Sequence, residues 1–382
     1  MADIQSLLAT NERISRDLLA KNADQIDQSR KFPRENVQAL GKAGLFGLLV
    51  PPQYGGSGAT LADMSKVIEA QAENCASTAM VMLMHYCSSA AIAAKGENAM
   101  KERLLPPIAR GEHLTTLAFS EAGSGGHFYM PVSEVRMNGV QKRLTASKSF
   151  VTSAGEADSY VVSTRKAGAS GPTDVNLYVL PKGATGFTTA GHFEGLGLAG
   201  NASGPMKLED VLIEDSTRLG PEGSGFQSML EVVLPHFQIG VASVSLGIAT
   251  AAFHTITAHV GARKYEHAGG AALASIPRVQ FLEAEMAVEL NSSQAYLGET
   301  IRKALGGDPA AMIDVLGVKV KAADACLAVV SRAMTLGGGW AFGRRGGLER
   351  MFRDAQAASV MAPASDVLKD FIGKACLGLP LF

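Results

Sequence analysis

Three ionisable side chains lie in apolar, helix-forming stretches where a general base could work. His236 occurs in LPHFQIG, His85 in MLMHYCSS and Asp366 in APASDVL. Imidazole titrates near neutral pH, and a carboxylate can also accept a proton. We therefore take these residues as candidate catalytic groups. The alternatives are packing or core roles for the two histidines and a helix-cap or turn role for Asp366.

No metal site is predicted. His254 and His259 fall on one expected helix, but their five-residue spacing turns them onto different faces. No third ligand is evident, and the four cysteines lack metal-ligand spacing.

The sequence pattern that predicts secondary structure changes twice along the chain, from helical to β-rich and back to helical. Residues 1–113 read as a helical domain, interrupted by a Pro- and Gly-rich loop that ends in the helix-capping pattern of Thr60 and Asp63. Residues 114–222 contain short β-rich runs separated by turn residues, which predicts a small antiparallel β domain. Residues 223–382 return to helical patterns over 224–263, 275–305, 308–336 and 355–372. The expected fold is α+β and multidomain, with a C-terminal four-helix bundle.

Composition excludes several classes of partner. The 382-residue chain has a formal net charge of −1, which does not favour nucleic acid. We expect no membrane span, because no run of about 18 apolar residues is present. The N-terminus lacks a signal-peptide core, so we expect a cytoplasmic protein. Charged residues make up only 19% of the chain, and the helix at 224–263 is apolar all round. Both features favour a homo-oligomer, a homodimer or homotetramer.

Four motifs, in order, resemble the acyl-CoA dehydrogenase family over nearly the whole chain. They are LAFSEAGSGG, MNGVQKRLTASKSFVTSAGEADSYVV, GPEGSGF and GGGWAFGRRGGLERMFRDA. The resemblance implies a flavoprotein oxidoreductase with bound FAD. It also implies a small-molecule substrate, an acyl-CoA or related acyl thioester, and an electron acceptor.

The resemblance assigns cofactor contacts residue by residue. Phe150 would lie against the flavin ring, and Thr152 would offer its hydroxyl and amide near N5. Leu117 and Ser120 would contact the pyrimidine side, in the same loop as Gly126. The remaining contacts fall in the last domain. Arg263 would reach the FAD pyrophosphate of the neighbouring subunit, Gly338 and Gly339 would allow close backbone approach, and Thr335 stands where the family often has a flavin-binding Gln.

The sequence departs from the family at the catalytic base. The usual position of the glutamate holds Ala362, and the alternative position on the long helix holds Phe237, followed by Gln238. Neither Ala362 nor Phe237 can accept a proton, which is why His236, His85 and Asp366 are considered instead. The missing glutamate leaves a second hypothesis open. It is a flavin-dependent monooxygenase on the same scaffold, supplied by a flavin reductase and using oxygen. A third is a flavin-binding subunit without chemistry.

Overall fold

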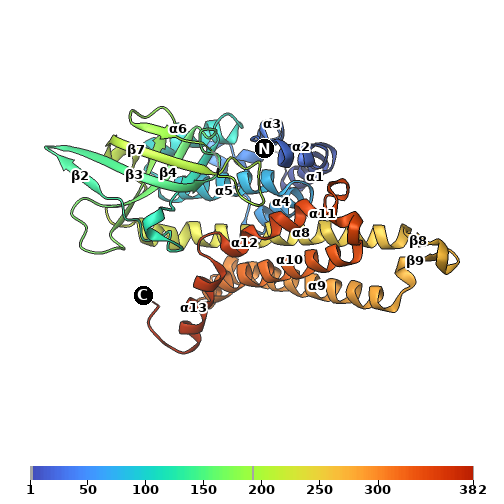
Figure 1. Cartoon of the computed structure of the whole chain (residues 1–382). Coiled ribbons are helices and arrows are strands. Elements are labelled where there is room, and N and C mark those ends of the chain that lie inside the picture. The colour runs from blue at the N-terminus through green and yellow to red at the C-terminus, as the bar shows by residue number, and fades with distance from the viewer. Residues whose placement is uncertain (1–2, 192, 382) are drawn as a thin grey trace.

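A computed structural model describes residues 3–191 and 193–381 of the chain (Figure 1). The N-terminal part is helical, as predicted. Thr60 and Asp63 form the predicted cap, in which the backbone N–H of Asp63 donates to Thr60 Oγ1 and that of Thr60 donates to the Asp63 carboxylate. The helices are α1 (Ile4–Ile14), α2 (Ala20–Ser29), α3 (Arg34–Lys42), α4 (Leu61–Asn74), α5 (Ala76–Lys95) and α6 (Asn98–Ala109), with a π-helical turn at Ser15–Leu19 joining the first two.

The middle part folds as two small sheets. One has the strand order β1-β4-β5 and the other β2-β3-β7-β6. One pairing differs from the predicted antiparallel arrangement, because β1 and β4 run parallel, with Leu117 opposite Val161. A long connection carries the chain between these two strands, so parallel pairing is possible. The strands are β1 (Thr115–Ala118), β2 (Val135–Asn138), β3 (Gln141–Val151), β4 (Ser159–Arg165), β5 (Val175–Pro181), β6 (Phe187–Thr189) and β7 (Gly204–Ile213).

The C-terminal part is again helical, and the last predicted helix is wrong in one respect. Residues 355–372 do not form one helix, because the chain leaves helical geometry between α12 and α13, around Pro363. Proline lacks the N–H that a continuous helix requires. The elements are α7 (Gly225–Ser228), a π-helical turn (Met229–Val233), α8 (Leu234–Ala262), β8 (Lys264–Tyr265), β9 (Ala271–Ala272), α9 (Pro277–Leu305), α10 (Ala311–Phe342), α11 (Leu348–Ala355), α12 (Ala357–Val360) and α13 (Ser365–Cys376).

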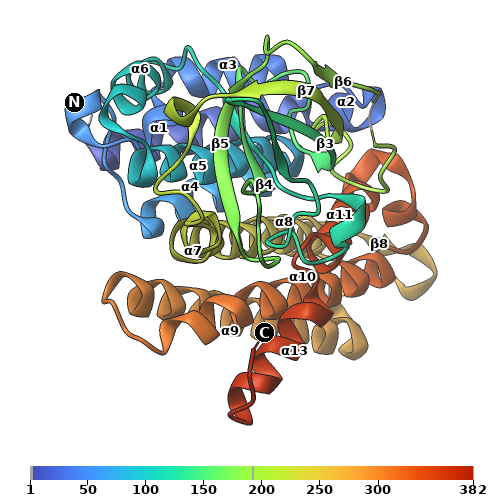
Figure 2. The same ribbon diagram turned by 90° about the vertical axis from the view of Figure 1, so that its left-hand side faces the viewer.

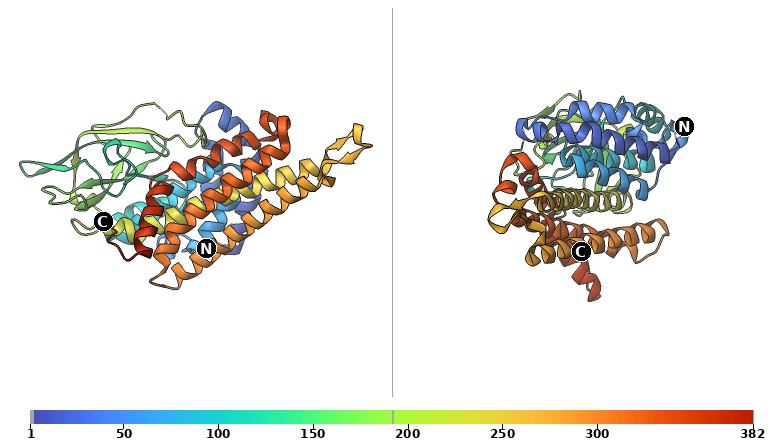
Figure 3. Two further views of the ribbon diagram at one scale, coloured as in Figure 1. Left: turned by 60° about the horizontal axis from the view of Figure 1, so that its bottom comes forward. Right: turned by 90° about the vertical axis from the view of Figure 1, so that its right-hand side faces the viewer.

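Helix α8 joins the parts of the molecule. It packs against α4 and α5 on one side and α9 and α10 on the other, so the N-terminal helices and the bundle share one core (Figure 2). The sheets lie beside one end of α8, and the β8–β9 hairpin projects from the opposite end (Figures 1 and 3).

Two helical stretches, Ala76–Lys95 and Gly225–Ala262, are long and apolar enough to cross a membrane by length and composition, contrary to our expectation from the sequence. Of their most apolar windows, 89% and 83% is buried inside the protein, as in core helices of a folded domain.

Candidate functional site

A cavity of about 890 Å³ opens where the sheets, α5, α8 and the segment around α12 meet. Its walls are mainly apolar: Met80 and Met84 come from α5, and Phe237 comes from α8. Phe119 and Phe128 complete one side and stack with ring centroids 6.0 Å apart. An apolar cavity with a few polar groups on one edge is suited to a flat, aromatic ligand.

Five predicted cofactor contacts line this cavity together: Leu117, Ser120, Gly126, Phe150 and Thr152. Phe150 lies at an irregularity in the pairing of β3 with β7 and has a φ of 54°, a conformation that side chains rarely adopt. The residue is 60% exposed, and its ring makes an edge contact with that of Phe193, with centroids 5.0 Å apart. The β-bulge thus directs an aromatic face to the cavity instead of the core.

A buried ion pair that we did not predict fixes the loop carrying Ser120 and Gly126. Lys148 Nζ lies 2.6 Å from Glu121 Oε1, and both side chains are almost completely buried. Glu121 also accepts the N–H of Val132 at 2.7 Å and the N–H of Ser133 at 2.9 Å. Burial alone would raise the pKa of Glu121, but the Lys148 charge and these hydrogen bonds hold it below the ordinary value. The only signal in the sequence was the presence of Glu121 in the motif LAFSEAGSGG and of Lys148 in the motif MNGVQKRLTASKSFVTSAGEADSYVV.

A second unpredicted element is the irregular segment 193–201, which we name the cavity strap. Phe193, Leu196 and Leu198 of the strap line the cavity. The backbone N–H of Leu198 donates to Asp354 Oδ1 at 2.6 Å, which attaches the strap to α11. Burial raises the pKa of Asp354 to about 6. Asp354 therefore holds one wall of the cavity in place.

Arg353, which precedes Asp354 on α11, lines the cavity and is held by its own ion pairs. Its guanidinium lies 2.6 Å from Asp27 and 2.8 Å from Glu349, and it donates to Leu196 O at 3.2 Å. Arg353 and Glu121 are the two ionisable residues among those that line the cavity in the described chain, and both are engaged in ion pairs. Ala362 lines the cavity as well, and it offers no proton acceptor.

His85 is not a catalytic residue in this structure. Its side chain is completely buried and does not line the cavity. Nδ1 accepts the backbone N–H of Thr115 at 3.2 Å, and Nε2 lies 3.1 Å from Phe46 O, to which it donates. Burial lowers the pKa of His85 to about 4. Both nitrogens are occupied, so this neutral imidazole joins α5 to the chain before α4 and to β1.

His236 and Asp366 also lie outside the lining of the cavity. His236 Nδ1 lies 2.7 Å from Val232 O one turn earlier on the same helix, and burial lowers its pKa. This geometry is that of a packing histidine. Asp366 is exposed in the first turn of α13 and faces a neighbouring cavity. Neither predicted base therefore lies among the residues that line the cavity with the predicted flavin contacts.

The other predicted cofactor contacts lie together at the opposite end of α8. Arg263 caps this helix, and Gly338 interrupts α10 with a φ of 52°. His259 stacks on Trp340 with ring centroids 3.9 Å apart, which joins the two places. Gly339 has open space beside its Cα, whereas Thr335 donates its hydroxyl to Ser331 O. None of the four predicted residues lines the apolar cavity of the same chain.

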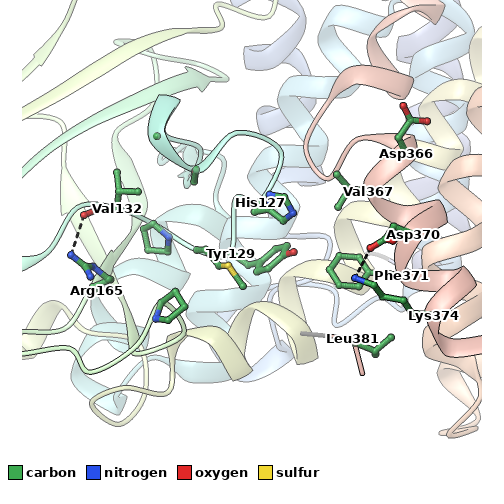
Figure 4. A pocket seen from close by; sticks show the side chains of 15 residues that line it. His127, Tyr129, Val132, Arg165, Asp366, Val367, Asp370, Phe371, Lys374 and Leu381 are labelled. Atoms are coloured by element: carbon green, nitrogen blue, oxygen red, sulfur yellow. Dashed lines mark hydrogen bonds and ion pairs between the residues drawn. The ribbon is translucent and has the colours of Figure 1, made fainter. Parts of the chain in front are cut away.

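A second cavity of about 830 Å³ adjoins the first. Figure 4 shows His127 and Tyr129 on one side, facing Phe371 and Lys374 of α13 on the other. The boundary is narrow, because a Cβ on Gly126 would meet a methyl group of Val367 at 3.3 Å. Its lining cations are paired: Lys374 lies 2.8 Å from Asp370, and Arg165 lies 2.9 Å from Glu134.

The first cavity fits a flavin better than a metal. Its lining combines aromatic side chains with the hydroxyl-bearing residues Ser120 and Thr152, the kinds of group that an isoalloxazine ring requires. Within residues 3–191 and 193–381, no group of three or more His, Cys, Asp or Glu side chains is arranged to hold a metal ion.

Comparisons with known proteins agree with this architecture. The models of the N-terminal, middle and C-terminal domains of acyl-CoA dehydrogenases match residues 2–112, 116–211 and 223–377. The short-chain specific acyl-CoA dehydrogenase of Clostridium acetobutylicum is 27% identical, over 91% of this chain and 90% of that protein. Mitochondrial isobutyryl-CoA dehydrogenase of Bos taurus is 28% identical, over 94% of this chain and 85% of that protein.

Solved structures share the fold. Butyryl-CoA dehydrogenase from Megasphaera elsdenii superimposes with a TM-score of 0.91 at 24% identity, covering 99% of each chain. The prolyl acyl carrier protein oxidase AnaB superimposes with a TM-score of 0.89 at 19% identity, covering 99% of this chain and all of that one. Three domain models in order, full-length relatives and a cavity lined mainly by apolar and aromatic residues lead to one conclusion: this chain belongs to the acyl-CoA dehydrogenase family and is a flavoprotein oxidoreductase whose cofactor is FAD.

Proposed function

We propose that the protein oxidises an acyl-CoA or a related acyl thioester by hydride transfer to the flavin. The observation that carries this proposal is the apolar cavity that places Phe150 and Thr152 beside Ala362 and Phe237. FAD bound there would supply the hydride acceptor at N5. Leu117, Phe150 and Thr152 would hold the ring, and the methionines of α5 would cover the acyl chain.

Removal of the substrate's α-proton must differ from the common mechanism. The lining residues of the described chain include two ionisable groups, Glu121 and Arg353, and both are ion-paired. A methyl group stands at Ala362. We therefore infer that the proton leaves to water, and that ordinary saturated acyl-CoAs are oxidised slowly.

The second cavity would receive the arm that carries the thioester. It adjoins the first across Gly126 and Val367. Because Lys374 and Arg165 already have carboxylate partners, this cavity offers a phosphate little free positive charge. We expect a thioester with a short uncharged arm to bind at least as well as a CoA ester.

FAD binding would require two copies of the chain. At a rise of about 1.5 Å per residue, the helix from Phe237 to Arg263 spans roughly 39 Å. Arg263, Arg344 and Arg345 form no ion pair within the described chain, and all three lie at the end that carries Gly338. We propose that a homodimer, or a homotetramer built from it, brings this basic end to the cavity of the neighbouring copy.

One specific observation supports an alternative. Because the cavity lacks an available base, a monooxygenase that uses reduced flavin and oxygen remains a second candidate, with a flavin reductase as its partner. The discriminating experiment mixes FAD-loaded protein with acyl-CoAs and acyl-N-acetylcysteamine thioesters without oxygen. Bleaching of the flavin supports the dehydrogenase and requires an electron acceptor for turnover. No bleaching, together with oxygen-dependent product when reduced flavin is supplied, supports the monooxygenase.

A further inference from the structure

The connection between α12 and α13 contains no side chain that can form a hydrogen bond. Its residues are Met361, Ala362, Pro363 and Ala364, and all except Pro363 line the flavin cavity. Such irregular backbone must find partners for its buried carbonyl groups. Any hydrogen bond from this wall of the cavity to a ligand must therefore come from its peptide groups.

Lys319 of α10 supplies those partners. Its side chain is fully buried, and Nζ donates to Met361 O at 2.7 Å and to Pro363 O at 2.5 Å. Within residues 3–191 and 193–381, no carboxylate forms an ion pair with it. Burial lowers the pKa of Lys319 to about 7. A buried cation held only by two carbonyl groups is costly, and this cost calls for a functional explanation.

The two bonded carbonyls belong to the peptide groups whose N–H groups come from Ala362 and Ala364. Neither N–H has an acceptor within the described part of the chain. A cation bound to the oxygen of a peptide group polarises that group and strengthens its N–H as a donor. One ammonium therefore acts on the two peptide groups at the cavity wall.

We propose that Lys319 is a positioning residue for the flavin site, which fixes the 361–364 segment and activates the N–H groups of Ala362 and Ala364 as donors to the cavity ligand. This inference rests on the proposed place of the flavin. It explains how a wall without polar side chains takes part in binding. The backbone N–H groups of this segment supply hydrogen bonds that none of its side chains can supply.

The test compares Lys319→Met with Lys321→Met, its neighbour on α10, which forms an ion pair with Glu289. Lys319→Met should raise the dissociation constant for FAD at least tenfold, alter the absorption bands of bound flavin, and speed amide exchange in peptides covering 357–368 more than tenfold. Lys321→Met should leave all three unchanged. The proposal would be overturned if Lys319→Met had the same amide-exchange rates and FAD affinity as the unaltered protein. It would also be overturned if both variants changed by the same amount.

A measurement on the unaltered protein covers the case in which Lys319→Met does not fold. Saturating FAD should slow acetylation of Lys319 at least tenfold and leave Lys321 unaffected; equal rates with and without FAD would refute the proposal. If the protein binds no FAD at all, the proposed function fails, whereas the exchange of 357–368 in apo Lys319→Met still reports whether Lys319 fixes the segment.

Discussion

Replacing Glu121 with glutamine should destabilise the protein by about 3–5 kcal/mol, because it leaves the Lys148 ammonium buried without a counter-charge. The structure sets this magnitude. The two side chains are 2% and 0% exposed, and the carboxylate accepts from Lys148, Val132 and Ser133. Glutamine keeps one acceptor oxygen but turns an amide N–H₂ toward an ammonium group.

The assay is thermal and urea unfolding of Glu121→Gln beside the unaltered protein, with FAD affinity measured in parallel. We expect a fall in the unfolding temperature on the order of 10 °C. FAD should also bind more weakly, since the loop of Ser120 and Gly126 loses its anchor. The double variant Glu121→Gln, Lys148→Met should recover most of the stability, because no charge remains buried. A loss below about 1 kcal/mol, or a double variant worse than the single, would refute the reasoning.

Four further predictions concern single residues. The pKa of the neutral His85 is depressed to about 4, so its contribution to stability is complete above pH 6.5 and is lost as pH falls toward 4. His85→Asn should therefore reduce the change in unfolding free energy between pH 6.5 and pH 4 by up to about 3 kcal/mol. Asp354 has the opposite sign: its raised pKa gives stability below pH 4 that disappears as pH rises through about 6, so Asp354→Asn should be up to about 3 kcal/mol more stable at pH 7, as urea unfolding would show. Ala362→Glu should place a carboxylate in the cavity and speed anaerobic flavin bleaching by acyl-CoA at least about 100-fold, the typical gain from a general base; an unchanged stopped-flow rate would argue against α-proton removal. Arg263→Ala should weaken FAD binding by about tenfold or more in fluorescence titrations without changing the binding of riboflavin, which has no phosphate, and equal losses for both would contradict a phosphate contact between copies.

Local pattern selected five residues that the fold brings together in one cavity. Leu117 lies in the short strand β1 and Ser120 just after it within one motif, and Phe150 and Thr152 lie at the end of the hairpin strand β3 and just beyond it within another. Their positions relative to each other are set by neighbouring strands and a turn, so motif order located them. The order of helices, sheets and helices followed from hydrophobic periodicity for the same reason.

The candidate bases failed because burial and partner geometry are tertiary properties. His85 directly follows Met84, which lines the cavity together with Met80 one turn earlier, yet its imidazole turns toward Phe46 and Thr115. Residue type and spacing do not specify which side of a helix faces a ligand when apolar residues occur all round it. The parallel pairing of β1 with β4 was missed because strand direction depends on where distant segments meet.

The sequence by itself determined the family, the three-part architecture and the absence of a glutamate at Ala362, and it brought five proposed flavin contacts to one cavity, because each depends on residue types at short spacing. Only the tertiary structure decided that His85, His236 and Asp366 stand away from the cavity, that the strap at 193–201 closes it, and that Lys319 holds the segment around Ala362. These contacts join residues far apart in the chain, and they form only when separate elements are buried against each other and their polar groups must find partners.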